Sequence, residues 1–291
     1  MTVIRSPIKM IGGKGVLRNR ILPFFPEHRC YVEPFGGGAN LLLVKARGEV
    51  EVYNDLDPRM VGLFRCIVDP DLRERLTWKL SLTPYSRQER LASKAGALEE
   101  KDPVEQARMF FTDSRQSLGG MLDRSSWGLV TNTSVRGMAQ PISAYFKIIQ
   151  MLPRIGERMK DVVLLNKDWK EVVTEFDSND TLFYMDPPYP KETRRDGWYN
   201  FEMSTDDHEE LVKRIKKLKG MVILSGYPND TYLDLEANNW RRVEFNRSCN
   251  AAARTKHTQL QGDGIIKTFQ KRTECIWLSP NIPKPEREAT D

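Results

Sequence analysis

The chain has 291 residues, 40% of them hydrophobic and 29% charged, and its 45 Lys and Arg against 40 Asp and Glu give a net charge of +5. Such a length suits one large domain or a domain with an inserted module. No apolar run approaches the roughly 20 residues that span a bilayer, and the first residues lack a signal-peptide pattern. We therefore expect a cytoplasmic protein without membrane association.

The four cysteines are scattered without paired spacing, at Cys30, Cys66, Cys249 and Cys275. Zinc sites and disulfide frameworks have paired spacings, so we expect buried thiols and no metal. The basic residues, in contrast, gather after residue 189 and between residues 241 and 272. Such clusters can contact phosphates, although a solvated surface explains most charge runs.

Strand-like and helix-like patterns alternate along the chain. A buried strand over 30–35 ends in the glycine turn Gly36-Gly37-Gly38, and the segment 39–46 has helical character. A second strand over 49–53 precedes a helix that begins near Pro58. Short apolar runs predict further strands at 162–165, 181–185, 221–224 and 274–278, and a charged helix is predicted over 206–218. This alternation predicts an α/β fold with a largely parallel sheet.

The stretch 73–140 interrupts the alternation with helical segments and a polar, glycine-containing region. It is predicted to be a module inserted into a domain formed by residues 1–72 and 141–280, with a loose tail at 281–291. Within the module, Asp102 can cap a helix that opens at Pro103. Phe110 and Phe111 of this helix are expected in the core rather than on a binding surface.

Two glycine turns and one acid indicate a small-molecule site. A glycine turn after the first strand lets a ligand approach the backbone, and the acid after the second strand is where this topology places a ribose partner. Gly36-Gly37-Gly38 and Asp55 occupy those places. This pattern alone fits a dinucleotide, S-adenosylmethionine (SAM) or a simple turn. The upstream turn Gly12-Gly13-Lys14-Gly15 lacks the Ser or Thr of a phosphate loop, which argues against nucleotide triphosphates.

The tetrapeptide Asp186-Pro187-Pro188-Tyr189 follows the strand 181–185 and combines an acid, a rigid backbone and an aromatic ring. Its carboxylate can accept a hydrogen bond from an exocyclic amine, the Pro187 carbonyl has no competing helical role, and the ring can stack on a base. The same residues are also common in ordinary strand-to-loop turns.

Taken together, Lys9-Met-Ile-Gly-Gly-Lys14, Glu33-Pro-Phe-Gly-Gly-Gly-Ala39, Asn54-Asp55 and Asp186 to Tyr189 resemble, in this order, the Dam-like (alpha-order) SAM-dependent DNA adenine N6-methyltransferases. Arg272-Thr-Glu-Cys-Ile-Trp277 is similar to the terminal Arg-x-Glu strand of that family. The resemblance implies a Rossmann-like SAM-dependent methyltransferase sheet with an inserted, mostly helical DNA-recognition module. The family often has glycine where this chain has Ala39, a change that a helix start should tolerate.

The resemblance also implies which residues form the site. Residues that bind SAM are expected at Met10, Gly12, Lys14, Glu33, Pro34, Phe35, Gly36, Gly37, Gly38, Asp55, Asp168 and Trp169. Asp55 would bind the ribose hydroxyls and Lys14 would lie near the methionine moiety. Asp168 and Trp169 would lie beside the adenine ring, although Asp168 can equally cap a helix from Trp169 to Val173.

The expected reaction is transfer of the SAM methyl group to the N6 amine of an adenine flipped out of duplex DNA. An aromatic amine is a poor nucleophile because its lone pair is delocalised into the ring. The Asp186 carboxylate and the Pro187 carbonyl are predicted to accept hydrogen bonds from it, with Tyr189 stacked on the base. No cysteine lies in the Pro-Cys turn used for attack on cytosine carbon, which argues against carbon methylation.

Double-stranded DNA is the expected partner, and the inserted module is expected to supply the contacts that offset base flipping. Candidate DNA-binding residues are Lys9, Arg115, Arg124, Asn132, Arg136, Arg195, Arg254 and Lys256. Arginine can bind guanine through two hydrogen bonds, but more such contacts go to phosphates. A restriction endonuclease is a candidate counterpart, a bacterial or phage-infected cell is the expected setting, and a monomer is adequate for modifying one base.

Three other readings stay open. A cytosine N4-methyltransferase uses similar amine chemistry, but more often has Ser in place of Asp186 and a different motif order. Enzymes that methylate RNA or protein amides usually have Asn at this position. A catalytically silent DNA-binding module could retain the fold, although the cofactor and base motifs are both present here.

Overall fold

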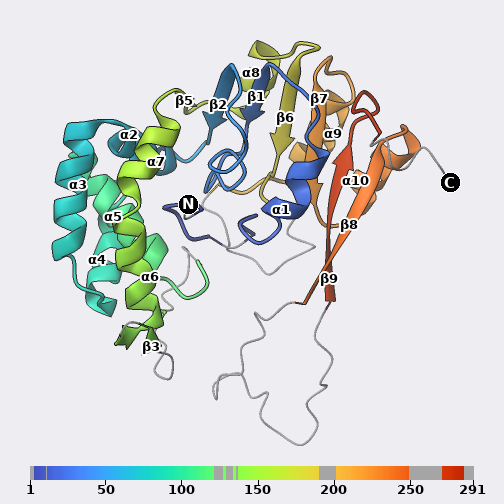
Figure 1. Cartoon of the computed structure of the whole chain (residues 1–291). Coiled ribbons are helices and arrows are strands. Elements are labelled where there is room, and N and C mark those ends of the chain that lie inside the picture. Colours follow the sequence, from blue (N-terminus) through green and yellow to red (C-terminus); the bar gives the residue numbers. More distant parts are fainter. Residues whose placement is uncertain are drawn as a thin grey trace, which may run out of the picture.

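The computed structural model describes residues 3–10, 12–120, 127–128, 134–135, 137–189, 201–248 and 271–284. It is a mixed α/β structure built on a seven-stranded sheet with the order β5-β2-β1-β6-β7-β9-β8 (Figure 1). Its strands are β1 (Cys30–Glu33), β2 (Val50–Asn54), β5 (Val163–Leu165), β6 (Thr181–Met185), β7 (Met221–Gly226), β8 (Arg241–Ser248) and β9 (Lys271–Leu278). Each strand predicted from an apolar run is present, and β8 is an additional one.

The sheet is parallel except at one edge, where β9 lies antiparallel between β7 and β8. β1 pairs with β2 on one side and with β6 on the other, both in parallel. The chain therefore reverses its direction of travel across the sheet between β1 and β6, which is where α/β sheets open a crevice at the carboxyl ends of their strands. The glycine turn after β1, Asp55 after β2 and Asp186 after β6 meet at the carboxyl ends of these strands.

The central strands are buried on both faces, which explains why they appear in the sequence as apolar runs rather than as alternating patterns. All five residues of β6 are buried. Successive residues contribute to opposite faces: Tyr31 and Tyr184 belong to one core cluster, whereas Val32 and Phe183 belong to the other.

The described helices are α1 (Arg18–Ile21), α2 (Pro58–Val68), α3 (Pro70–Leu82), α4 (Arg87–Gly96), α5 (Pro103–Gln116), α6 (Gln140–Ile149), α7 (Leu152–Met159), α8 (Trp169–Glu175), α9 (Thr205–Ile215) and α10 (Asp230–Ala237), with a 3-10 turn over Leu22–Phe24. Short strands β3 (Ser134–Val135) and β4 (Met138–Ala139) pair with each other. Helices α2 to α7 gather at one side of the molecule, beyond the β5 edge of the sheet (Figure 1).

Helix α5 is the centre of this helical group and packs against α2, α3 and α4. The Asp102 side chain accepts a hydrogen bond from the Val104 N–H, as expected for the cap before Pro103. Phe110 and Phe111 are both fully buried, which confirms their place in the core. Because α2 also packs on α5, the proposed boundary between residues 72 and 73 runs between helices in contact, and the division into domains stays a prediction.

The helix expected over 39–46 is not formed, and the segment is a series of turns. Ala39 has a left-handed backbone with φ of 51°, which a helix start does not have. The Leu42 N–H donates to the Glu33 carboxylate at 3.0 Å instead of to a carbonyl one turn earlier. The apolar pattern predicted the burial of Leu41, Leu42 and Leu43, which is observed, but not the backbone conformation.

Cysteines 30, 66 and 275 are free and buried, as expected for core thiols, and burial raises the pKa of each. Cys249 lies outside the described residues.

Candidate functional site

The glycine turn after β1 lies tightly against the end of β2. The Gly36 N–H donates to the Asn54 carbonyl at 2.7 Å, and the Tyr53 hydroxyl donates to the Gly37 carbonyl at 2.7 Å. A Cβ atom on Gly36 would lie 2.3 Å from a carbon of the Tyr53 ring and 2.9 Å from the Asn54 oxygen. The turn therefore needs glycine at this position so that its backbone can face the crevice.

Asp55, directly after β2, holds this turn in place through hydrogen bonds. Its Oδ2 accepts from the Gly37 N–H at 2.8 Å and its Oδ1 from the Asp57 N–H at 2.8 Å. Burial raises the pKa of Asp55 to about 6, although both N–H groups favour the carboxylate. Each carboxylate oxygen can accept more than one hydrogen bond, so binding of ribose hydroxyls, which stays a prediction, is compatible with these contacts.

Asn54, the partner of Asp55 in the sequence motif, is completely buried and has a bracing role. Its amide donates to the carbonyls of Pro34 at 2.8 Å and Lys167 at 3.0 Å, and its carbonyl accepts from the Lys167 N–H at 2.9 Å. Asn54 thus ties the end of β1 to the loop between β5 and α8, which carries Asp168.

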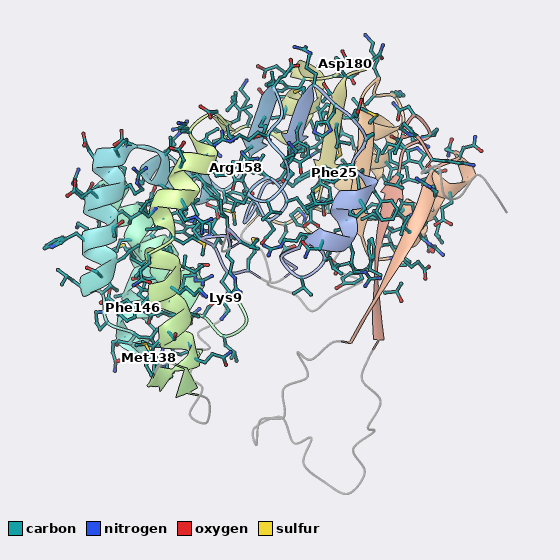
Figure 2. All side chains as sticks on the ribbon, in the orientation of Figure 1. Lys9, Phe25, Met138, Phe146, Arg158 and Asp180 are labelled. Carbon is teal, nitrogen blue, oxygen red and sulfur yellow. The ribbon has the colours of Figure 1, made fainter. Side chains whose placement is uncertain are left out.

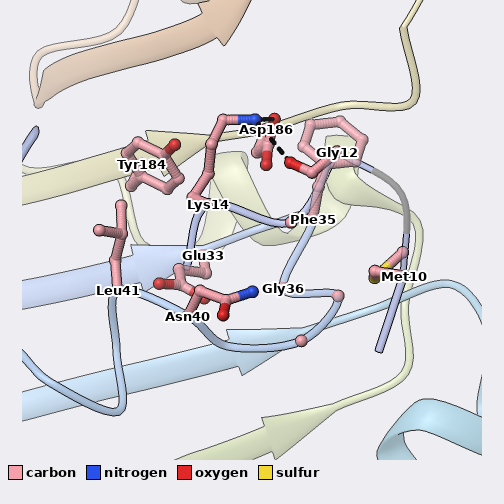
Figure 3. A pocket seen from close by; sticks show the side chains of 13 residues that line it. Met10, Gly12, Lys14, Glu33, Phe35, Gly36, Asn40, Leu41, Tyr184 and Asp186 are labelled. Carbon is pink, nitrogen blue, oxygen red and sulfur yellow. Dashed lines mark hydrogen bonds and ion pairs between the residues drawn. The ribbon is translucent and has the colours of Figure 1, made fainter. Parts of the chain in front are cut away.

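Two adjoining cavities lie along these loops. The smaller, of about 440 Å³, is bounded by both glycine turns, Glu33 and Asp186 (Figure 3). The larger, of about 1020 Å³, is bounded by Asp55, Asp168 and Trp169 and also reaches Asp186. Every residue that we predicted to bind SAM lines one cavity or both, so the structure brings the whole predicted set together.

Glu33 is a buried acid at the wall of the smaller cavity. Its Oε1 accepts from the Tyr31 hydroxyl at 2.7 Å and from the Leu42 N–H at 3.0 Å. Burial raises the pKa of Glu33 to about 7, against the effect of these two donors. Glu33 therefore changes charge near neutral pH.

Asp168 does cap α8, because its Oδ1 accepts from the Lys170 N–H at 2.8 Å. It also borders the larger cavity, so the two readings of this residue are compatible. The Trp169 ring is almost buried and lies 5.9 Å from the Phe35 ring, tilted by 36°. These rings form an apolar wall suited to a flat aromatic ligand.

At the end of β6, the partly exposed Asp186 belongs to a charge cluster that the sequence did not predict, and Figure 3 shows its pairing with Lys14. The Lys14 ammonium, 3% exposed, donates to Asp186 Oδ1 at 2.7 Å, to the Gly12 carbonyl at 3.2 Å and to the Tyr189 hydroxyl. Glu274 of β9 completes the cluster, with its Oε1 3.0 Å from the Lys14 nitrogen and 2.8 Å from the Tyr189 hydroxyl.

The charges of this cluster stabilise one another. Burial would lower the pKa of Lys14, but Asp186, Tyr189 and Glu274 raise it well above its usual value. Burial raises the pKa of Asp186, and Lys14 opposes that change. Lys14 was predicted near the methionine moiety of a cofactor; it does line the smaller cavity, but its ammonium points to Asp186. Glu274 was not predicted, and the only sequence signal for it was the Arg272-Thr-Glu274 similarity.

Tyr189 is 1% exposed. Its ring lies 4.8 Å from the Tyr227 ring and 4.9 Å from the Lys14 nitrogen. Stacking of Tyr189 on a flipped base stays a prediction. Because the Tyr189 ring is buried, a base can reach it only if some of the groups packed on the ring move. Pro187 is buried between Asp186 and Tyr189.

Of the predicted DNA-binding residues, the structure describes Lys9 and Arg115. The others lie outside the described residues: Arg124, Asn132, Arg136, Arg195, Arg254 and Lys256. The Lys9 side chain lies between the helical group and the sheet and donates to the Ser117 carbonyl at 3.0 Å (Figure 2). Burial and the nearby Arg115 lower the pKa of Lys9 to about 8, and burial lowers the pKa of Arg115 to about 10. A bound anion would stabilise these two cations.

Ser114, near the end of α5, is hydrogen-bonded to Lys9, which lies just before the first glycine turn. The Ser114 hydroxyl accepts from the Lys9 N–H and donates to the Lys9 carbonyl, both at 2.8 Å. Gly120, with φ of 86°, lies so close to Met10 that a Cβ atom would be 2.6 Å from the Met10 Cα. Through these contacts the helical group holds the loop that lines both cavities.

We expect Ser114→Ala to destabilise the protein and weaken SAM binding, because it leaves the Lys9 N–H and carbonyl without their buried partner. The expected cost is about 1–3 kcal/mol, or a melting temperature lower by roughly 2–4 °C for each kcal/mol. Thermal melting and SAM titration measure both effects. Ser81→Ala is the matched control, since the Ser81 hydroxyl bonds only to the Trp78 carbonyl on the exposed surface of α3. Equal melting of the two variants would contradict this role.

Within the described residues, no cluster of three or more His, Cys, Asp or Glu side chains could hold a metal ion. Of the helices described, none has the length and apolar character to cross a membrane.

Comparisons with known proteins agree with the motif order. Residues 10–240 match the sequence model of the family described as D12 class N6 adenine-specific DNA methyltransferase. The chain is 22% identical over 223 residues to "Type II methyltransferase M.CviBI" of Paramecium bursaria Chlorella virus NC1A, covering 75% of this chain and 80% of that protein. It is 40% identical over 63 residues to "Modification methylase StsI" of Streptococcus sanguinis, which covers 21% of this chain and only 10% of that longer protein.

Proposed function

Because this chain belongs to the D12 class N6 adenine-specific DNA methyltransferase family, we propose that it transfers the methyl group of SAM to the N6 amine of an adenine flipped out of duplex DNA. The observation that carries the proposal is the position of Asp186. This acid follows β6 and borders both cavities.

The residues of the cavities fit SAM. When bound, SAM supplies a sulfonium methyl group. The backbone of Gly36 to Gly38 offers the close approach that a Cβ atom would block. Asp55 would bind the ribose hydroxyls, and Asp168 with Trp169 would bind the adenine ring. The smaller cavity, with Met10, Lys14 and Glu33, would take the methionine moiety.

The chain's own residues would prepare the amine. The Asp186 carboxylate and the Pro187 carbonyl accept its hydrogen bonds, which favours the pyramidal nitrogen with a localised lone pair and holds it in line with the methyl group. Lys14 holds Asp186 through Oδ1 at 2.7 Å and so fixes the direction of the carboxylate. An acid at this position, rather than Ser or Asn, favours adenine over cytosine and amide substrates.

Double-stranded DNA would bind across the helical group. Of the candidate DNA-binding cations, the structure describes Lys9 and Arg115. The two relatives are a modification methylase and a type II methyltransferase by name, which supports a role in restriction and modification with an endonuclease counterpart. A monomer in the cytoplasm of a bacterial or phage-infected cell suffices for this role.

The direct test is to incubate the purified protein with tritiated SAM and mixed-sequence duplex DNA and to digest the product to nucleosides. We expect label in N6-methyldeoxyadenosine. Label only in cytosine would contradict the proposed substrate, whereas retained DNA binding without transfer would favour a silent module. Sequencing of the methylated DNA then identifies the target site.

A further inference from the structure

Glu274 is a buried acid that has no role in the proposed steps of methyl transfer. It lies on β9, 3% exposed, and its Oε1 is 3.0 Å from the Lys14 nitrogen and 2.8 Å from the Tyr189 hydroxyl. Both neighbours also belong to the surroundings of Asp186. A charged side chain is buried in this way only when it is paired, so its position is tied to Lys14 and Tyr189.

Lys14 is shared between two carboxylates. An ammonium has three donors, and the Lys14 nitrogen has oxygens of Gly12, Asp186, Tyr189 and Glu274 around it. In a buried site a charge-assisted hydrogen bond is strong. A lysine paired with Asp186 alone would concentrate its charge on that carboxylate and weaken it as an acceptor for another donor. A second carboxylate, Glu274, shares the charge of Lys14 and so weakens the interaction between Lys14 and Asp186.

We propose that Glu274 is a positioning residue of the methyl-transfer site: it holds the Lys14 ammonium and the Tyr189 hydroxyl, and thereby keeps Asp186 a strong acceptor for the target amine. This role rests on the proposed function. Glu274 acts through Lys14 and does not itself border either cavity.

The cluster gives this role a signature in the pH dependence of the reaction. Among the described residues, the titratable groups that interact electrostatically with Asp186 are Lys14 from the first glycine turn, Glu33 from β1, Tyr184 from β6, Tyr189 after β6, Tyr232 from α10 and Glu274 from β9. After burial and Lys14, the negative charge of Glu274 raises the pKa of Asp186. Removal of that charge therefore lowers the pKa of Asp186, and the carboxylate form persists to lower pH.

The test compares Glu274→Gln with wild type in single-turnover methyl transfer between pH 5 and 9. We expect a rate about 10- to 100-fold lower, by analogy with the loss seen when a residue that orients a metal ligand is replaced, and an acid limb displaced to lower pH. Both proteins keep Glu33, whose pKa burial raises to about 7 in the wild type, so the difference between their acid limbs reports on the change at residue 274. Glu244→Gln on the neighbouring β8 is the matched control, since its side chain is 46% exposed and the charge change is the same.

A variant with the wild-type rate and acid limb would overturn the proposal, and so would a lower rate with an unmoved limb, which indicates a merely structural role. If Glu274→Gln does not fold, the double variant Lys14→Met with Glu274→Gln, which removes one charge of each sign, replaces it. Since the two residues act as a unit, we expect the double variant to be no slower than Lys14→Met alone; a further, additive loss contradicts the proposal. Absence of transfer by the wild type itself would instead refute the proposed function.

Discussion

Asp186→Ala is expected to lower the rate of methyl transfer by at least roughly 10²–10³-fold, the usual loss when one preorganised electrostatic group is removed from a reacting centre, and to leave SAM binding largely intact. The carboxylate is the proposed acceptor for the target amine. Its loss does not leave Lys14 unpaired, because Glu274 and Tyr189 remain. The fold should therefore survive. Transfer of label from tritiated SAM measures the rate, and calorimetric titration measures cofactor affinity.

Two further variants test whether the effect belongs to this position. Asp186→Asn keeps the shape but removes the charge, and we expect it to be nearly as slow as the alanine variant. Asp206→Ala removes an exposed acid from the first turn of α9 and should retain wild-type activity. Near-normal turnover by Asp186→Ala would remove this residue from the mechanism.

Gly36→Ala is expected to have the largest effect on cofactor binding, at least a tenfold loss of SAM affinity, a factor equivalent to about 1.4 kcal/mol. The new Cβ atom would meet the Tyr53 ring at 2.3 Å and the Asn54 carbonyl at 2.9 Å. Neither can move easily, because Tyr53 is fully buried and the Asn54 oxygen belongs to the backbone. The turn must then move into the crevice, and overpacking of this kind costs about 1–3 kcal/mol. SAM titration and thermal melting measure both losses.

Gly62→Ala is the matched control for that substitution. Gly62 lies inside α2, and its added Cβ atom would have only the Gln106 Oε1 near it, at 3.5 Å. Alanine favours a helix over glycine by about 1 kcal/mol, so this variant should melt higher and bind SAM normally. Unchanged SAM affinity in Gly36→Ala would show that the close approach at this turn is not required.

The positions of the strands along the chain and the glycine turn could be predicted from the sequence because their causes are local. Strands buried on both faces need apolar runs such as Thr181–Met185, and parallel strands place the following loops at one edge. The helix predicted over 39–46 was wrong for a reason that is not local. The Glu33 carboxylate captures the Leu42 N–H, and Ala39 adopts a left-handed backbone.

The resemblance to Dam-like enzymes is confirmed at the level of the D12 class family. The predicted cofactor residues line the two cavities, but their contacts with SAM stay predictions. Sequence reasoning missed Glu274 and Ser114, and it placed Lys14 beside the cofactor without its partner. The contact between Lys14 and Asp186 joins residues 172 positions apart, and nothing in their neighbourhoods along the chain specifies it.

By itself, then, the sequence determined the family, the parallel sheet and the chemical character of the site, since apolar runs, glycine turns and an acid before two prolines act through their nearest neighbours. Only the tertiary structure decided how the charges are paired. The antiparallel placement of β9 beside β7 brings Glu274 to Lys14 and Tyr189. Burial then makes that pairing obligatory, because a lone charge in the core costs far more than the pair.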